Sequence, residues 1–261
     1  MIGSKDGYAL ITGASSGIGY ELAKLFAKDG KNIVVVARSQ DKLEDLKKEI
    51  EDKYETNVMV LVKDLSDPNS PQEIYSELEG KNINVDVLVN NAGFAVYGKF
   101  AETDWGKEFD MIQVNITSLT HLTKLFLKKM IENRSGKIMN VSSGAGFISC
   151  PLLSVYAATK SYVLHFTEAL ANEVKGTGVT VTCLCPDGTR TNFWERGKGE
   201  HSRAGRGRLM DAAKAAKVGY SALKKEKVFA LAGQVSVTPF ILRIAPRGLL
   251  VKIARQKFER A

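Results

Sequence analysis

The sequence predicts an α/β protein with a Rossmann-like, doubly wound parallel β-sheet of about seven strands, flanked by helices on both faces. Short apolar runs rich in valine and isoleucine alternate along the chain with longer stretches of helical periodicity. Runs that are apolar at consecutive positions are typical of strands buried on both faces of a parallel sheet. Because each strand is followed by a helix, right-handed crossovers should join neighbouring parallel strands.

The individual elements follow from the same two patterns. The predicted strands are the apolar runs at residues 8–12, 32–37, 57–62, 85–90, 136–141, 179–185 and 227–231. Helical spacing of apolar residues fills the intervals between them. It is seen at Leu22, Leu25 and Phe26, at Leu43, Leu46 and Ile50, and in a longer helix at Leu119, Leu122, Leu125, Phe126 and Met130.

Length and composition favour a single domain. The 261 residues, 44% of them hydrophobic, are enough for one sizeable core, so residues 1–261 are expected to form one dinucleotide-binding and catalytic domain. Within it, residues 192–210 are expected to be a mobile substrate loop and residues 236–261 a basic, amphipathic tail. The first residues do not resemble a signal sequence, and no run approaches the roughly 18 apolar residues of a membrane span, so a cytoplasmic protein is expected.

Charge is spread unevenly along the chain. The net charge is +8, but residues 196–261 hold 16 basic and 4 acidic residues, whereas residues 1–195 hold 21 basic and 25 acidic ones. A basic tail on a slightly acidic body indicates an anionic partner, although not a nucleic acid. The three cysteines and three histidines are too scattered for a metal site, so no metal is expected and buried thiols are the favoured interpretation.

A glycine-rich turn follows the first predicted strand. The sequence TGASSGIG places Gly13, Gly17 and Gly19 at the turn and in the first residues of a helix. Glycines there let the backbone turn sharply and let a diphosphate approach the N–H groups at the helix N-terminus. An ordinary tight turn is the alternative, but the position between a buried strand and an amphipathic helix favours a dinucleotide site.

The second predicted strand ends in Ala37 and Arg38. An acidic residue at this place usually holds the ribose 2′-hydroxyl of a dinucleotide. A guanidinium suits a 2′-phosphate instead, so the sequence favours NADP(H) over NAD(H). The alternative is a solvated arginine that binds no ligand.

Tyr156 and Lys160 are one helical turn apart in the stretch SVYAATKSYV. Residues at positions i and i+4 lie on one face of a helix, so the phenol and the ammonium should project together. In one interpretation, the tyrosine packs in the core beside a lysine that extends along it to solvent. In the other, the tyrosine is an acid whose pKa the lysine ammonium lowers. The spacing alone does not decide between the two.

Together, these motifs resemble those of the short-chain dehydrogenase/reductase (SDR) family, in its single-domain branch with a Y-x-x-x-K active site. They match in order over residues 7–192: TGASSGIG at 12–19, Asp64 after the third strand, NNAG at 90–93, Asn115 in VNITS, VSS at 141–143, and Tyr156 with Lys160. Asp187 is a departure, because the family usually has glycine directly after this proline. We interpret Gly188 as taking over that strained backbone position, with Asp187 facing solvent or the substrate mouth.

The resemblance implies catalytic roles for Asn115, Ser143, Tyr156 and Lys160. Tyr156 is the general acid/base at the carbonyl oxygen, and Lys160 binds the nicotinamide ribose and helps to lower the pKa of the phenol. Ser143, rather than its neighbour Ser142, binds the substrate oxygen. Asn115 holds a water that relays protons to Lys160 or, in the alternative, only kinks its helix. The implied cofactor-binding residues are Gly13, Ser15, Ser16, Gly17, Ile18, Gly19, Arg38, Asp64, Leu65, Asn90, Asn91, Ala92, Gly93, Tyr156, Lys160, Pro186, Thr189 and Thr191.

The implied function is that of an NADP(H)-dependent oxidoreductase, which interconverts a carbonyl and a secondary alcohol by hydride transfer. The expected substrate is an apolar or acyl-type small molecule, and the expected assembly is a homodimer or homotetramer. The alternative is a catalytically silent NADP(H)-binding regulatory protein, although all four catalytic positions are filled.

The C-terminal third resembles that of an SDR subset whose chains end in a basic, apolar helical tail. Leu249, Leu250, Ile253 and Ala254 recur there at helical spacing, and Pro239 and Pro246 divide the tail into short helices. The tail is expected either to pack on the domain or on a second subunit, or to make a weak peripheral membrane or acyl-carrier contact.

Overall fold

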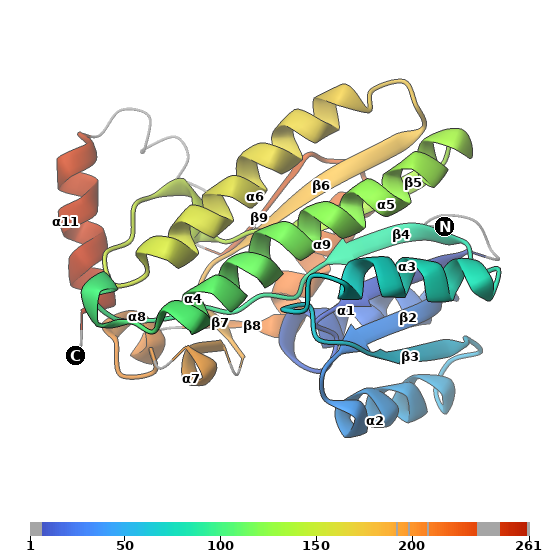
Figure 1. Cartoon of the computed structure of the whole chain (residues 1–261), viewed down its shortest axis with the longest axis horizontal. Coiled ribbons are helices and arrows are strands. Elements are labelled where there is room, and N and C mark those ends of the chain that lie inside the picture. Colours follow the sequence, from blue (N-terminus) through green and yellow to red (C-terminus); the bar gives the residue numbers. More distant parts are fainter. Residues whose placement is uncertain (1–6, 192, 198, 208, 234–245, 260–261) are drawn as a thin grey trace.

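The computed structural model describes residues 7–191, 193–197, 199–207, 209–233 and 246–259. Its centre is a seven-stranded parallel sheet in the order β3-β2-β1-β4-β5-β6-β9 (Figure 1), which confirms the predicted fold class. The strands are β1 (Tyr8–Thr12), β2 (Asn32–Ala37), β3 (Val58–Val62), β4 (Val85–Asn90), β5 (Gly136–Val141), β6 (Val179–Pro186) and β9 (Phe229–Ala232). Each corresponds to one of the predicted apolar runs.

Helices cover the sheet on both faces. On one face lie α1 (Gly17–Lys28), α2 (Gln40–Glu51) and α9 (Ala212–Lys224), and on the other α3 (Ser70–Gly80), α5 (Leu119–Glu132) and α6 (Ser154–Glu173). Along β1, Ala9 and Ile11 belong to the first core layer and Leu10 to the second. Both faces of the strand are therefore buried, which is why the strands appear in the sequence as unbroken apolar runs.

The direction in which the chain adds strands reverses between β1 and β4. From β1 the sheet grows through β2 to β3, and from β4 it grows the opposite way through β5 and β6 to β9. The crossovers on the two sides therefore lie on opposite faces, and a crevice opens at the carboxyl ends of β1 and β4.

A chain of buried amides and hydroxyls connects β4 and β5 to the helices above them. Asn90 Nδ2 donates to Thr123 Oγ1 and to Asn140 Oδ1, both at 2.9 Å. Asn140 Nδ2 in turn donates to Thr167 Oγ1 at 3.0 Å, and all four side chains are buried. Because buried polar groups need hydrogen-bond partners, these bonds fix α5 and α6 to the two strands.

The predicted substrate loop contains regular structure. It holds α7 (Phe193–Arg196) and α8 (Arg203–Arg206), and a small parallel sheet of β7 (Thr189–Arg190) and β8 (Met210–Asp211) joins its two ends. None of the helices in the described part of the chain combines the length and the apolarity needed to cross a membrane.

The predicted tail contributes α11 (Arg247–Phe258), which begins directly after Pro246 and lies beside α8 at one end of the molecule (Figure 1). Its buried residues are Ala254 and Phe258, whereas Leu249 and Ile253 are 52% and 54% exposed. Of the apolar residues at helical spacing in the sequence, Ala254 is buried, whereas Leu249 and Ile253 face solvent. The buried face of α11 therefore differs from the face that the spacing predicted. The first part of the predicted tail, including Pro239, lies outside the described residues.

We expect Asn140→Ala to lower the free energy of unfolding by about 2 kcal/mol, because it deprives Asn90 of an acceptor and Thr167 of a donor inside the core. Urea unfolding, monitored by circular dichroism, measures the change in the free energy of unfolding. The control is Asn32→Ala, which removes one exposed bond to the Asn57 N–H and should cost less than about 1 kcal/mol. A smaller loss for Asn140→Ala than for the control would contradict the importance of the buried network.

Candidate active site

A cleft of about 890 Å³ runs along the carboxyl ends of the strands. Arg38 and Asp64, which follow β2 and β3, line it on one side of the reversal in strand order. Tyr156 and Phe258 line it on the other side. Ligands of open α/β sheets bind at such a reversal, so the cleft has the position of a binding site.

The glycine-rich turn offers bare backbone to this cleft. Gly13 and Gly17 have φ values of +66° and +62°, which residues with side chains rarely adopt. A Cβ on Gly13 would lie 2.9 Å from Asn91 Nδ2, and one on Gly17 would lie 2.6 Å from Thr191 Cγ2. Any side chain at either position would therefore distort the turn from which α1 begins.

Most of the predicted cofactor residues line the cleft. They are Gly13, Ser15, Ser16, Gly17, Ile18, Arg38, Asp64, Leu65, Asn91, Ala92, Gly93, Tyr156, Lys160, Pro186, Thr189 and Thr191. Gly19 lies behind the turn, where a Cβ would come within 2.6 Å of the Gly13 carbonyl oxygen. Asn90 departs from its predicted role, because its amide donates within the buried network and not into the cleft. Side chains alternate along β4, so Asn90 turns inward and Asn91 turns toward the cleft.

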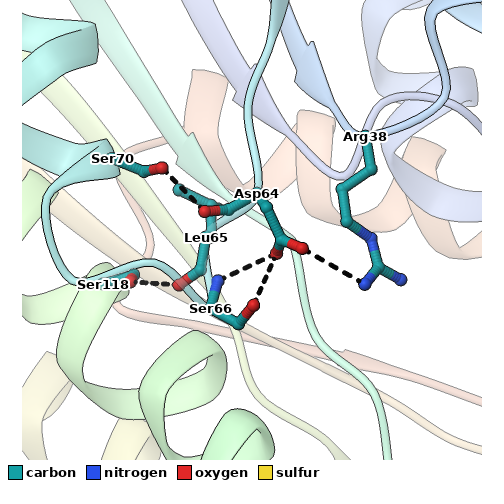
Figure 2. Close-up of polar contacts among 6 residues, drawn as sticks. All are labelled: Arg38, Asp64, Leu65, Ser66, Ser70 and Ser118. Atoms are coloured by element: carbon teal, nitrogen blue, oxygen red, sulfur yellow. Dashed lines mark hydrogen bonds and ion pairs between the residues drawn. The ribbon is translucent and has the colours of Figure 1, made fainter.

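Arg38 and Asp64 face each other at the ends of β2 and β3 (Figure 2). Arg38 Nη1 lies 3.5 Å from Asp64 Oδ2, and Asp64 Oδ1 accepts the N–H and the hydroxyl of Ser66 at 3.0 and 2.8 Å. Burial raises the pKa of Asp64, but the bonds from Ser66 and the charge of Arg38 outweigh it, so the pKa lies below its ordinary value. The carboxylate is therefore ionised at neutral pH, and the Arg38 side chain remains 65% exposed.

Backbone carbonyls in the same loop are also held in place (Figure 2). Ser70 Oγ donates to the Asp64 carbonyl and Ser118 Oγ to the Leu65 carbonyl, both at 2.7 Å. Ser118 is the last residue of a π-helical turn, η2 (Gln113–Ser118), which joins α4 (Trp105–Ile112) to α5. The loop after β3 is thus anchored to the start of α5, on the face of the sheet that also carries α3.

Tyr156 and Lys160 lie close together on α6, as their spacing predicts. Lys160 Nζ is 5.9 Å from the centroid of the Tyr156 ring and donates to the Val141 carbonyl at 2.9 Å. The Ser143 side chain is hydrogen-bonded to Tyr156, whereas Ser142 Oγ donates to the Lys160 carbonyl at 2.7 Å. The structure therefore brings the phenol, the ammonium and the Ser143 hydroxyl together, and Ser142 supports the backbone of α6.

Burial dominates the electrostatics of this cluster. It raises the pKa of Tyr156 well above the ordinary 10.0, while the hydrogen bond to Ser143 acts in the opposite direction. It also lowers the pKa of Lys160 to about 8. Lys160 is not among the groups that shift the pKa of the phenol, and its ammonium donates to the Val141 carbonyl. At neutral pH the phenol is protonated and the ammonium is charged.

Asn115 lies within the π-helical turn η2 and is fully buried. Its amide accepts the N–H of Phe94 at 3.2 Å and donates to the Phe94 carbonyl at 3.0 Å and to Thr159 Oγ1 at 3.1 Å. A Cβ added to Gly93 would lie 3.0 Å from Asn115 Oδ1 and 3.2 Å from Lys160 Nζ. The structure thus shows the helix distortion of the alternative interpretation together with proximity to Lys160, although Asn115 does not itself line the cleft.

Beyond Tyr156 the cleft has an apolar wall. The Phe193 ring lies 5.2 Å from the Tyr156 ring, centroid to centroid. Ile148, Leu153 and Phe258 line the same end. A large apolar substrate could therefore lie against this wall while its reacting group meets the phenol.

The end of α11 is held against this wall by hydrogen bonds to its backbone. Tyr97 Oη donates to the Phe258 carbonyl at 2.6 Å, and the Arg203 N–H donates to the Glu259 carbonyl at 2.9 Å. Sequence reasoning missed several residues that line the cleft, namely Lys63, Lys107, Arg203, Lys257 and Phe258. Among these five residues, only Lys63 is adjacent in the sequence to a residue that the motifs identified, namely Asp64.

Asp187, the departure from the family pattern, connects the loop after β6 to α11. Its Oδ1 accepts the N–H of Gly188 at 2.8 Å and lies 3.7 Å from Lys257 Nζ. Gly188 is not one of the glycines with positive φ in the described ranges. The interpretation that it takes over a strained backbone position is therefore not supported.

Comparison with known proteins agrees with this arrangement. Residues 7–200 match the family model described as short chain dehydrogenase. Human very-long-chain 3-oxoacyl-CoA reductase is 34% identical over 183 residues, or 69% of this chain and 58% of that protein. Mouse 17-beta-hydroxysteroid dehydrogenase type 3 is 34% identical over 181 residues, or 69% of this chain and 59% of that protein. The matched region thus spans less than two thirds of either relative.

A solved structure covers more of the chain. A short-chain dehydrogenase from Sphingobium yanoikuyae, in complex with NADPH, superposes with a TM-score of 0.84 at 28% identity. The superposition covers 93% of this chain and 94% of that one. The likeness therefore extends beyond residue 200, where the family match ends.

The buried Lys160 predicts a pH dependence of stability. Below about pH 8 the lysine is charged in both the folded and the unfolded chain, so the cost of burying the charge is fully present. As pH rises from about 8 to 10.5, only the folded protein loses the proton, and this cost is relieved. We expect the stability of the wild type relative to Lys160→Met to rise over this interval by up to about 3 kcal/mol. Urea unfolding of both proteins at several pH values measures the difference, and a difference that stays constant would contradict the lowered pKa.

Proposed function

Because the chain belongs to the short-chain dehydrogenase family, we propose that it is an NADP(H)-dependent reductase of ketones in large apolar substrates, with 3-oxoacyl thioesters as the best fit. One observation carries the proposal. Tyr156, Ser143 and Lys160 meet between a bare glycine turn and an apolar wall of the same cleft. A proton donor, a second hydroxyl and a cation are thus available at one reacting oxygen, beside a place for a dinucleotide.

The residues present fit such a dinucleotide. The turn at Gly13 and Gly17 leaves no Cβ in the path of a diphosphate, and Gly93 leaves room in front of Lys160 Nζ. In this proposal, Arg38 holds the 2′-phosphate and Lys160 the nicotinamide ribose. The bound cofactor supplies the hydride, while the protein supplies position and charge.

Tyr156 is the proposed proton donor to the ketone oxygen. Burial keeps its phenol protonated at neutral pH, which is the form required when a ketone is reduced. Ser143 is close enough to the phenol to donate a hydrogen bond to the same oxygen. The Lys160 ammonium lies 5.9 Å from the ring centroid and, in this proposal, positions the nicotinamide ribose beside the phenol.

The preference for NADP(H) is assigned to Arg38. Its ion pair with Asp64 is long, at 3.5 Å, and largely exposed to solvent, so it is weak. A 2′-phosphate offers a guanidinium a bidentate, doubly charged partner, whereas NAD(H) has only a hydroxyl at this position. Lys63 lines the same part of the cleft, but its ammonium is already paired with Glu73 at 2.6 Å.

The substrate class rests on the apolar wall and on the relatives. Ile148, Leu153, Phe193 and Phe258 provide a surface for a long acyl chain or a rigid polycyclic ketone. One relative is named for very-long-chain 3-oxoacyl-CoA and another for a 17-beta-hydroxysteroid. Because the chain spans less than two thirds of those proteins, their substrates are only candidates here.

We expect Tyr156→Phe to lower kcat for NADPH-dependent reduction of a 3-oxoacyl thioester by roughly 10²- to 10⁴-fold, because the proton donor is removed. The affinity for NADPH, measured by isothermal titration, should change little. The control is Tyr162→Phe on the same helix, whose hydroxyl contacts Thr120 instead of the cleft. Full activity in Tyr156→Phe would contradict the proposed role. NADPH binding without turnover of any ketone by the wild type would instead favour the regulatory alternative.

We expect Arg38→Ala to reduce the preference for NADP⁺ over NAD⁺ by roughly tenfold or more, since a charged hydrogen bond to the 2′-phosphate is lost. Dissociation constants of both cofactors, measured by isothermal titration, give this ratio. Lys128→Ala, which removes one positive charge from an exposed position on α5, should leave it unchanged. Equal affinities of the wild type for the two cofactors would show that the preference is assigned wrongly.

A further inference from the structure

Lys257 brings a positive charge to the substrate end of the cleft. It lies next to Phe258 near the end of α11, and both residues line the cleft together with Tyr156. Its charge also reaches Cys150, whose pKa burial raises to about 12 while Lys257 acts in the opposite direction. Phe258 and Tyr156 belong to the same buried cluster, so Lys257 follows the apolar wall of the cleft at its outer, partly exposed side.

The position of Lys257 is fixed by backbone bonds to two separate segments. Tyr97 Oη donates to the carbonyl of Phe258, and the Arg203 N–H donates to the carbonyl of Glu259. The second bond also brings Arg203, another residue that lines the cleft, next to the end of α11. Two basic residues from different elements are therefore held at the same end of the cleft.

The partner of Lys257 in the structure is easily exchanged. Its Nζ lies 3.7 Å from Asp187 Oδ1, which is longer than a hydrogen bond. The two side chains are 56% and 26% exposed, and ion pairs of this kind contribute about 1 kcal/mol at most. An anion that enters the cleft can replace Asp187 at small cost.

We propose that Lys257 is a specificity-determining residue, which binds a phosphate group of the coenzyme A carrier of a thioester substrate. The inference rests on the proposed reductase function and adds to it the part of the substrate that lies beyond the reacting ketone. Arg203 supports the same phosphate-bearing segment, and Asp187 holds the ammonium in place between turnovers. Lys107 and Asp110 of α4 also line this cleft, but their opposite charges offset each other.

The competing interpretation is that the Asp187–Lys257 pair only fastens α11 to the loop after β6. If the pair only fastened α11, its removal would change kcat/KM equally for all substrates. Recognition of an anion would make Lys257 matter only for substrates that carry one, and would make Asp187 a competitor of that anion. The two interpretations therefore predict opposite effects of removing the Asp187 charge.

The test compares two thioesters of the same 3-oxoacyl chain, one of coenzyme A and one of the neutral N-acetylcysteamine. We expect Lys257→Met to lower kcat/KM for the coenzyme A ester by about fivefold, mainly through KM, and to leave the neutral ester nearly unchanged. Asp187→Asn should raise kcat/KM for the coenzyme A ester by about twofold. Lys252→Met, an exposed position of the same helix, is the matched control and should change neither value.

Binding of coenzyme A alone to the full chain, measured by isothermal titration with NADP⁺ present, gives a readout that does not need turnover. A weaker dissociation constant in Lys257→Met and a tighter one in Asp187→Asn are expected. Equal losses for both esters, or an unchanged affinity for coenzyme A in Lys257→Met, would overturn the inference. Failure of the wild type to reduce either ester would contradict the proposed function, whereas the coenzyme A affinities would still decide the role of Lys257.

Discussion

The hydrogen bonds between Thr12 and Asn91 fix the geometry on which the rest of the site depends. Thr12 Oγ1 accepts the N–H groups of Asn91 and Ala92, both at 3.0 Å, and Asn91 Nδ2 donates to the carbonyls of Thr12 and Gly13 at 2.9 and 3.2 Å. They join β1 and β4 at the point where the strand order reverses. The same segment continues into Gly93, in front of Lys160, so one set of bonds sets the spacing between the glycine turn and the proposed proton donor.

The sheet could be predicted because strands buried on both faces appear in the sequence as short runs of consecutive apolar residues. A run such as 32–37 has no polar face, and the chain contains seven runs of this kind. The glycine turn was equally visible, since Gly13 and Gly17 occupy backbone conformations that other residues avoid. The inward position of the Asn90 side chain could not be predicted, because a motif gives the position of a residue and not the face of the strand to which its side chain turns.

The electrostatics of the Tyr156–Lys160 pair could not be predicted to the same degree. Helical spacing places the two residues on one face, but it does not say where a long, flexible side chain will find its hydrogen-bond partner. That partner is the carbonyl of Val141, at the end of a strand that is adjacent only in the folded protein. The burial of both groups likewise results from packing against distant segments. The resulting raised pKa of Tyr156 is a property of the fold.

The way in which α11 is attached has a consequence for how this protein could diversify. The bonds from Tyr97 and Arg203 are accepted by main-chain carbonyls of Phe258 and Glu259, which every amino acid provides. Side chains of the helix can therefore be exchanged while those bonds persist. Strands β1 to β6 and the proposed proton donor belong to the part of the chain that matches the family, whereas α11 follows it. Selection can thus alter which molecules are accepted by changing a short C-terminal segment, with little risk to the fold or to the chemistry.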